Sequence, residues 1–304
     1  MREPVPVVGV TILTTYITRS RHFVLALLAT VCTVLSGCSA PTLESRSLAD
    51  MVVFSADAVW LSDNRIYFLR NRSSDSPDTD LWMADATGET HSVVLRDLSN
   101  RCASVSFRSL RRVGTRLGAM MFCAGSDGAV GVIIDPELGA VHEIAIPEGT
   151  VDLITRPDGS EAWAQYYVDG CISITPLMAG SSQLPTSPKF VPAILPTYGD
   201  RTLYFLTTAT RDGCSNNAAN WSLTGIQGSK VETLGEFREP NALEAREQDV
   251  LVAGERDGKR GIWRINRGAI TLVALGEYVT ISLSPDGKRL LAVAQHGDNV
   301  ILRL

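Results

Sequence analysis

Residues 279–304 read VTISLSPDGKRLLAVAQHGDNVILRL and contain two turns that separate short apolar runs. Each run has the length of one β-strand, and Pro-Asp-Gly favours a turn because Gly adopts positive φ without steric cost and Asp caps its own backbone. The stretch therefore predicts three strands joined by two turns, after which the chain ends. Because an unpaired strand edge invites aggregation, we expect the partner of the last strand elsewhere in the chain.

The same plan occurs earlier in the chain. Residues 151–175, VDLITRPDGSEAWAQYYVDGCISIT, again give a strand, a Pro-Asp-Gly turn, a strand, a Gly-containing turn and a strand. Four further copies have less regular turns. The first turns of the six units fall near Asp63, Gly114, Asp158, Gly199, Gln248 and Asp286, at spacings of 51, 44, 41, 49 and 38 residues. A period of roughly 40–45 residues with four strands per repeat is typical of β-propeller blades.

The third strand of each unit supports this register. The expected third strands are DLWMA, GVIID, CISIT, NWSLT, GIWRI and NVILR. Trp82, Trp221 and Trp263 recur on them, and this period favours packing between blades over a carbohydrate-binding platform. The sixth unit supplies three strands, and residues 49–54, ADMVVF, have no role within the first unit. We therefore predict an all-β fold over residues 49–304, a six-bladed β-propeller closed by pairing of this N-terminal strand with the last blade.

The turn-and-strand unit SPDGKRLLAVA resembles the repeats of TolB-like six-bladed propellers, also described as WD40-like PD repeats. The resemblance covers residues 49–304, and two of the six units carry Pro-Asp-Gly outright. It implies the fold and says little about function. TolB has an additional amino-terminal domain for which there is no room here, so its partner interactions are not carried over. The chain is also similar to propeller domains of actinobacterial envelope lipoproteins, which are thought of as scaffolds or regulators.

The amino end predicts export and lipidation. A basic flank precedes residues 23–35, FVLALLATVCTVL, a run with the length of a secretory signal core and too short to span a bilayer. The following boundary, LSGC at residues 35–38, resembles the bacterial lipobox. By that resemblance Cys38 would be lipidated and would become the first residue after cleavage. The alternative is a buried helix with a core cysteine. We expect residues 1–37 to be a lipoprotein signal peptide and residues 38–48 a polar tether.

Two or three acyl chains on Cys38 would anchor the protein stably, whereas one would not. We therefore expect the domain at the extracytoplasmic face of the cell membrane. Without residues 1–37 the chain carries 25 basic and 32 acidic side chains, a net charge of −7, which gives no electrostatic reason to bind nucleic acid or anionic lipid. The 24 arginines against 4 lysines are typical of a bacterium with a GC-rich genome, such as an actinobacterium.

Four cysteines remain in the expected mature domain: Cys102, Cys123, Cys171 and Cys214. Outside the membrane an even number favours disulfides, with three possible pairings. Cys102 and Cys123 lie at adjacent ends of one antiparallel hairpin, so we predict a bond between them. Cys171 and Cys214 lie on equivalent turns of neighbouring blades, which are too far apart for a bridge unless the loop after Cys214 bends, and their pairing stays open.

Metal and catalytic signatures are absent from the sequence. No two of these cysteines are closer than 21 residues, whereas zinc sites use close-set ligands. The remaining histidines, His91, His142 and His296, fall in three units without carboxylates at ligand spacing. The chain has no Gly-x-Ser-x-Gly elbow, phosphate-binding Gly loop or His-Glu-x-x-His motif. We therefore predict no catalytic residues, no metal and no cofactor.

Candidate binding residues lie on loops. In a propeller the turns between second and third strands share a face with the connections between blades, and two of these turns, 70–80 and 210–220, are enlarged. Enlarged loops on a rigid scaffold are common binding sites, although a solvated loop is the alternative for each. The charged candidates on these loops and on the adjoining stretches are Asp75, Asp78, Asp80, Arg211, Asp212, Arg238, Arg256 and Arg260.

These observations favour a membrane-anchored, non-catalytic scaffold that binds a protein or polymer of the cell envelope. Two alternatives remain. One is an extracytoplasmic lyase or hydrolase acting on a sugar or lactone, and the other is a sensor that binds a small ligand in the central channel. Fold alone does not decide among them.

Overall fold

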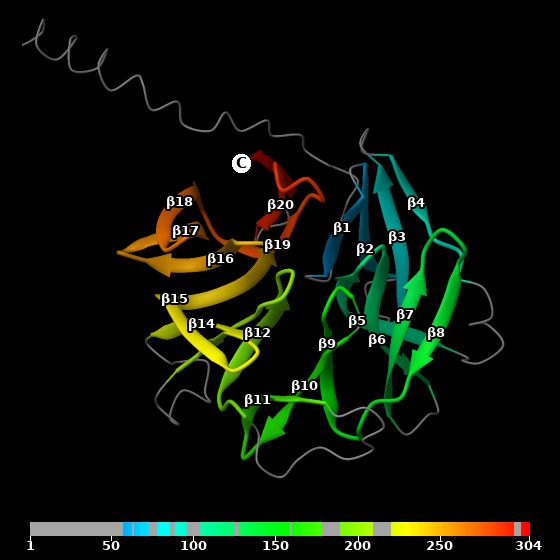
Figure 1. Cartoon of the computed structure of the whole chain (residues 1–304). Coiled ribbons are helices and arrows are strands. Elements are labelled where there is room, and N and C mark those ends of the chain that lie inside the picture. Colours follow the sequence, from blue (N-terminus) through cyan, green and yellow to red (C-terminus); the bar gives the residue numbers. More distant parts are fainter. Residues whose placement is uncertain are drawn as a thin grey trace, which may run out of the picture. The chain divides into compact units, whose positions relative to one another are not determined.

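The strands of the computed structural model pair in chain order into antiparallel sheets (Figure 1). The structure describes residues 57–62, 64–72, 78–85, 89–95, 104–124, 128–158, 160–177, 189–208, 220–294 and 299–304. Every element in these ranges is a strand, a turn or an irregular connection, which confirms the predicted all-β class.

We number the sheets 1 to 6 in chain order. Sheet 1 contains β1 (Ala58–Ser62), β2 (Arg65–Asn71), β3 (Thr79–Asp85) and β4 (Thr90–Ser92). Sheet 2 contains β5 (Val105–Val113), β6 (Arg116–Cys123), β7 (Ala129–Asp135) and β8 (Ala140–Ile144). Sheet 3 contains β9 (Thr150–Thr155), β10 (Ala162–Val168) and β11 (Cys171–Pro176).

Sheets 4 and 5 share one long strand, β15 (Lys230–Arg246). Its first part pairs with β14 and its second part pairs with β16, so the hydrogen-bonded ladder is continuous across both sheets. Sheet 4 also contains β12 (Ala193–Tyr198), β13 (Leu203–Thr207) and β14 (Trp221–Gln227). Sheet 5 also contains β16 (Asp249–Arg256), β17 (Lys259–Asn266) and β18 (Ala269–Leu275). Sheet 6 contains β19 (Tyr278–Leu283), β20 (Arg289–Ala294) and β21 (Asn299–Arg303).

The first strand of every sheet is irregular. In each sheet its pairing with the second strand shifts register once, as at a β-bulge. Bulges bend a strand, increase its twist and re-aim its side chains. In β5 and β12 the irregular segment includes a non-glycine residue with positive φ, Ser109 at 57° and Leu195 at 51°. The side-chain alternation of a regular strand is therefore interrupted where the sheets meet.

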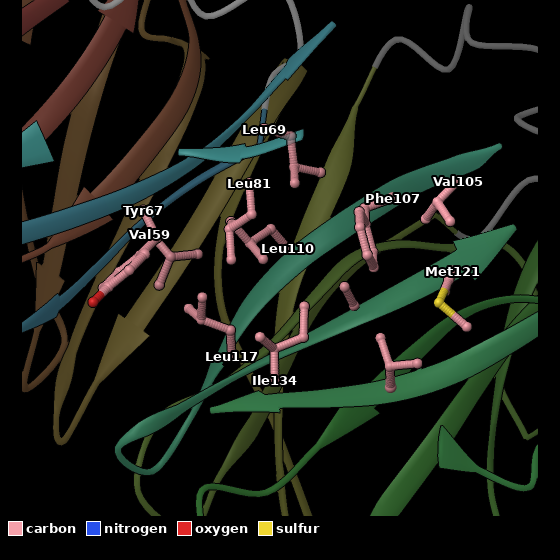
Figure 2. Close-up of a cluster of buried hydrophobic side chains, with 12 residues drawn as sticks. Val59, Tyr67, Leu69, Leu81, Val105, Phe107, Leu110, Leu117, Met121 and Ile134 are labelled. Atoms are coloured by element: carbon pink, nitrogen blue, oxygen red, sulfur yellow. The ribbon is translucent and has the colours of Figure 1, made fainter. Parts of the chain in front are cut away.

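Side-chain packing joins neighbouring sheets. Because successive residues of a strand face opposite sides, β2 contributes Tyr67 and Leu69 to a buried cluster shared with sheet 2. Figure 2 shows this cluster between the two sheets. The residues that alternate with them, Ile66 and Phe68, pack on the other side against Leu291 of sheet 6. Further apolar clusters join sheet 3 to 4, sheet 4 to 5 and sheet 5 to 6.

Neighbouring sheets contact one another in a cyclic order, mostly through their first strands. Strand β1 contacts β5 on one side and β19 on the other, β15 contacts β12 and β19, and β9 contacts β12 and β6. The first and last sheets are therefore neighbours although they lie at opposite ends of the described chain. This arrangement around a common centre is that of a β-propeller.

The expected third strands and the packing role of the tryptophans agree with the structure. The six expected third strands correspond to β3, β7, β11, β14, β17 and β21. Trp221 and Trp263 are buried in the cluster between sheets 4 and 5, and Trp82 packs partly buried against the cluster between sheets 1 and 6. The closing strand at 49–54, the signal peptide at 1–37, the tether at 38–48 and Cys38 lie outside the described residues. Among the described residues, no helix is long and apolar enough to cross a membrane.

Candidate functional site: a charged central channel

A cavity of about 220 Å³ lies at the centre of the sheets, and we call it the central channel. All six first strands, or the residues that flank them, contribute to its wall. Apolar residues of all six strands also adjoin it, but their side chains belong to or pack against the apolar clusters between the sheets: Val59, Leu110, Ile154, Leu195, Leu243 and Ile281. The lining of the channel is largely polar, and its acidic and basic side chains are Asp57, Arg111, Arg112 and Glu244.

Arg111 holds three sheets together at this centre. Its Nε donates to Asp152 Oδ2 at 3.1 Å, its Nη2 forms a shorter ion pair with the same oxygen, and its Nη1 donates to the carbonyl oxygen of Pro196 at 2.8 Å. These partners belong to β9 and β12, whereas Arg111 belongs to β5. The guanidinium group of Arg111 is therefore committed to protein partners.

Asp152 is only partly satisfied by this arrangement. Its side chain is 5% exposed, and its Oδ1 has no hydrogen-bond partner within the described part of the chain. A buried carboxylate oxygen without a donor is costly, so such groups are uncommon away from functional sites.

Asp57 precedes β1 and faces the same channel. The backbone N–H of Ser109 donates to its Oδ2 at 2.9 Å. Burial raises the pKa of Asp57, and this hydrogen bond and the charge of Arg111 offset the effect only in part. The positive φ of Ser109 is thus found at the residue whose N–H holds a channel carboxylate.

Glu244 of β15 has an unusual environment. Burial raises the pKa of Glu244 to about 7, although the charges of Arg112, Arg111 and Arg246 and a hydrogen bond from Leu283 act against the rise. That hydrogen bond, from the N–H of Leu283 to Oε1, is long at 3.5 Å. No ion pair between Glu244 and an arginine exists in the described ranges. A carboxyl group with a pKa near neutrality changes its protonation state close to physiological pH.

Arg112 also lines the channel, next to Arg111 in the sequence. In contrast to Arg111, its guanidinium group makes no hydrogen bond or ion pair with any residue that the structure describes. Arg112 lowers the pKa of Arg246, whose pKa is depressed first by burial and then by this repulsion. The part of the channel around Glu244 is therefore rich in positive charge.

A second hollow, of about 640 Å³, lies over the turns of sheets 4 and 5. Several of its charged side chains are paired with each other or with neighbours. Lys230 pairs with Glu232 at 2.9 Å, and Asp249 accepts two hydrogen bonds from Arg264 at 2.8 Å. This groove is consequently a solvated surface with fewer unsatisfied groups than the central channel.

The fold brings together only some of the loop residues that the sequence predicted to bind a partner. Arg238, Arg256 and Arg260 lie near the β16–β17 turn, where each is paired. Arg238 pairs with Glu255 at 3.3 Å, Arg256 donates to the carbonyl oxygen of Glu236 at 3.1 Å, and Arg260 pairs with Glu239 and Glu277.

Asp78 and Asp80 lie far from these in sequence, at the start of β3. Asp80 pairs with Arg72 at 2.9 Å, and Asp78 accepts a hydrogen bond from Ser104 of sheet 2. The remaining three loop candidates, Asp75, Arg211 and Asp212, lie outside the described residues.

The structure describes two of the four cysteines, Cys123 and Cys171. Cys123 ends β6 and Cys171 opens β11, and neither carries a free thiol. Cys102 and Cys214 lie outside the described residues, so the pairing of the four cysteines stays a prediction.

His91 lies close to two carboxylates, although no histidine was expected to have carboxylates at ligand spacing. Potential ligand atoms of Asp85, Glu89 and His91 lie within 4.8 Å of one another on the β3–β4 hairpin. The hairpin pairs His91 with Met83, two residues before Asp85 on the same face of the strand, and so brings His91 near Asp85, which the linear spacing does not show. Glu89 and His91 are exposed, and Asp85 already accepts a hydrogen bond from the backbone N–H of Glu89 at 3.1 Å. The cluster is thus explained as part of the turn.

The channel residues were missed by sequence reasoning. A signal was present, because Asp152 in TVDLIT and Glu244 in NALEA are acidic residues with uncharged neighbours in first strands. Charged side chains are rarely buried without partners, so a charge inside an inner strand indicates either a pair or a site.

No protein-family model and no curated protein matches the chain. Solved structures match in fold. A crystal structure of TolB from Acinetobacter baumannii has a TM-score of 0.54 and 14% identity, over 79% of this chain and 64% of that one. The protein XC5397 from Xanthomonas campestris, described as a gluconolactonase, has a TM-score of 0.55 and 13% identity, over 88% and 92% of the two chains. A chain of the mitotic checkpoint complex has a TM-score of 0.55 and 13% identity, over 88% and 95%.

These likenesses show the fold. The chain spans just under two thirds of the TolB chain, and the sequence identities are too low to transfer an activity. A propeller domain of a protease from Pyrococcus furiosus, with a TM-score of 0.51 and 12% identity over 78% of this chain and 74% of that one, belongs to the same set of folds.

Proposed function

We propose that this chain, which has a TolB-like β-propeller fold, is a non-catalytic binding scaffold that lipid holds at the extracytoplasmic face of a bacterial membrane. Its partner would be a protein or polymer of the cell envelope. The proposal of an anchor comes from the LSGC boundary that ends at Cys38. The proposal of a scaffold comes from the residues at the base of the loop between β2 and β3.

The observation that carries the scaffold is the pinned base of the loop between β2 and β3. The N–H of Arg72 donates to the carbonyl oxygen of Asp78 at 3.0 Å and closes the base, and Nε of Arg72 binds Asp80 at 2.9 Å. Thr79 is buried and accepts a hydrogen bond of 2.6 Å from the N–H of Phe107 in sheet 2. Residues 73–77 therefore start and end at points fixed to two sheets.

A fixed base lowers the entropy that a loop loses when it binds a partner. The lipid would confine the search for a partner to the membrane surface, which raises its effective concentration. Both effects would favour binding by a scaffold that displays its loops to a partner. Two fold neighbours are in keeping with this role, TolB and a component of the mitotic checkpoint complex, the latter being part of a protein assembly.

Site-specific photocrosslinking in cells tests the scaffold. A crosslinking residue at Asp75 or Asp212 is expected to capture a defined envelope component, because both positions lie on the enlarged second-to-third-strand loops. The matched control carries the crosslinker at Ser229, an exposed residue in the turn between β14 and β15 at the opposite end of the strands. Capture that is equal at all three positions, or absent at both loop positions, would contradict the proposal.

Membrane fractionation tests the anchor separately. Cys38→Ser is expected to move the protein from the membrane to the soluble extracytoplasmic fraction and to abolish incorporation of a labelled fatty acid. Cys32→Ser, within the expected signal core, is the matched control and is expected to leave both unchanged. Lipid labelling that persists in Cys38→Ser would show that the anchor has been misassigned.

A further inference from the structure

The net charge of the groups around the central channel depends on the protonation state of Glu244. Asp57, Glu244, Arg111 and Arg112 line the channel, and Asp152 pairs with Arg111. Protonation of Glu244 removes one negative charge from this set, and a bound monovalent anion would restore it. Arg246 also acts on Glu244, but it interacts as well with the acids Glu247, Asp200 and Asp286.

The two adjacent arginines of β5 differ in their partners. Arg111 is held by Asp152 and by the carbonyl oxygen of Pro196. Arg112 lines the same cavity, and its guanidinium group has no hydrogen-bond or ion-pair partner among the described residues. A guanidinium group offers a planar fork of donors that matches a carboxylate. Arg112 is therefore the available anion-binding group of the channel.

We propose that the central channel binds a small monocarboxylate anion at Arg112, together with one proton that Glu244 takes up from solvent. Arg112 donates to the carboxylate, and Glu244 becomes neutral so that it does not repel the anion. The first strands that line the channel contact the remainder of the ligand. This site does not rest on the proposed scaffold function, which uses the loops at one face.

The size of the cavity limits the ligand. A volume of about 220 Å³ corresponds to about seven water molecules at about 30 Å³ each. A molecule of about six to ten non-hydrogen atoms fits this volume, and butyrate has about six. Leu110, Ile154 and Leu243 adjoin the space at the edge of the clusters between the sheets, so the aliphatic part of the ligand is expected to be short.

The charged groups around Glu244 come from several elements. From β1 and β9 the acids are Asp57 and Asp152, from β5 the bases are Arg111 and Arg112, and on its own strand the base is Arg246. Arg246 interacts in turn with the acids Glu247, Asp200 and Asp286. The ionisable groups of β12 and β19 are the phenols Tyr198 and Tyr278, and burial raises the pKa of both. The arginines would repel a cationic ligand. A carboxylate could instead bind Arg112, whose guanidinium group has no partner among the described residues.

Isothermal titration calorimetry of residues 39–304, the chain without its expected signal peptide and lipidated cysteine, tests the proposal with three probes that share an unbranched aliphatic chain. The probes are butyrate, butyramide and butylamine. We expect butyrate alone to bind, with an affinity about tenfold weaker at pH 8 than at pH 6, because the pKa of Glu244 is about 7 and binding needs its proton. Titrations at pH 8 in two buffers of different ionisation enthalpy should show uptake of about one proton.

Three variants locate the site. Arg112→Gln should weaken butyrate binding at least tenfold, whereas Arg201→Gln, an exposed arginine outside the channel, should leave it unchanged. Glu244→Gln should bind butyrate equally at pH 6 and pH 8. The pH dependence and proton uptake of the unaltered protein test the proposal even if Arg112→Gln does not fold. Preference for butylamine, proton release on binding, or no binding of butyrate at either pH would overturn it.

Discussion

The backbone N–H of Trp60 donates a buried hydrogen bond of 2.9 Å to Oγ of Ser282, although 222 positions separate the two residues. Trp60 lies on β1, the first described strand, and Ser282 lies on β19 of the last sheet. The side chain of Trp60 packs with Phe68 and Leu291 in the cluster shared by these two sheets. The two ends of the described chain are therefore joined by both a hydrogen bond and apolar packing.

Ser282→Ala is expected to lower the free energy of unfolding by about 1–3 kcal/mol, because the N–H of Trp60 would be left buried without an acceptor. Ser222→Ala, on β14, is the matched control, because the hydroxyl group of Ser222 makes no hydrogen bond with the residues described. It should change the free energy by less than about 0.5 kcal/mol. Urea unfolding measures both, and equal effects would contradict the assigned role of Ser282.

Phe68→Ala tests the apolar contact between the first and last sheets. The side chain of Phe68 is fully buried against Leu291, so its removal should cost about 3–5 kcal/mol and leave a cavity. Leu138→Ala is the control, because Leu138 is 64% exposed. Thermal unfolding should show a large decrease in Tm for Phe68→Ala alone. A small decrease would mean that the two sheets separate without loss of the fold.

Peptide mapping without reduction tests the predicted disulfides. We expect a peptide that links Cys102 to Cys123 and another that links Cys171 to Cys214, because neither Cys123 nor Cys171 carries a free thiol. Removing the first bond with Cys102→Ser and Cys123→Ser should lower the free energy of unfolding by about 2–4 kcal/mol. Alkylation of all four cysteines in the unreduced protein would rule out both bonds.

The strands and turns of the blades could be predicted from the sequence because their determinants are local. The turn at Asp286 is an example, since its Oδ1 accepts hydrogen bonds from the N–H of Lys288 at 3.1 Å and from Oγ of Ser284 at 2.6 Å. The third strands could be placed because each is a short β-rich run that follows a turn. Period and turn chemistry thus determine the class of fold and the order of the strands.

The channel could not be predicted in the same way, because regular alternation fails in the strands that line it. Between Arg108 and Arg111 the register of β5 shifts, and Ser109 adopts positive φ. A shift of one residue exchanges the faces of a strand, so alternation does not indicate where Arg111 and Arg112 point. The partner of Arg111, Asp152, lies 41 positions away on another sheet. The loop candidates, by contrast, were chosen for exposure and charge, and those that are described mostly pair locally.

Glu244→Gln is expected to change how stability depends on pH. In the folded protein burial raises the pKa of Glu244 from 4.5 to about 7. A raised pKa means that the folded state binds the proton more tightly than the unfolded state. The stabilisation is therefore fully present below about pH 4.5 and is lost as the pH rises through about 7. The full difference corresponds to about 3 kcal/mol, and water in the channel would reduce it to about 1–3 kcal/mol.

Between pH 5 and pH 8 the unaltered protein should accordingly lose about 1–3 kcal/mol of stability relative to Glu244→Gln, which cannot ionise. Glu148→Gln, an exposed position before β9, is the control and should follow the unaltered protein at every pH. Urea unfolding at intervals of one pH unit measures the differences. If Glu244→Gln and the unaltered protein run parallel from pH 5 to pH 8, then Glu244 keeps its charge throughout, and the channel cannot take up the proton that carboxylate binding at Arg112 requires.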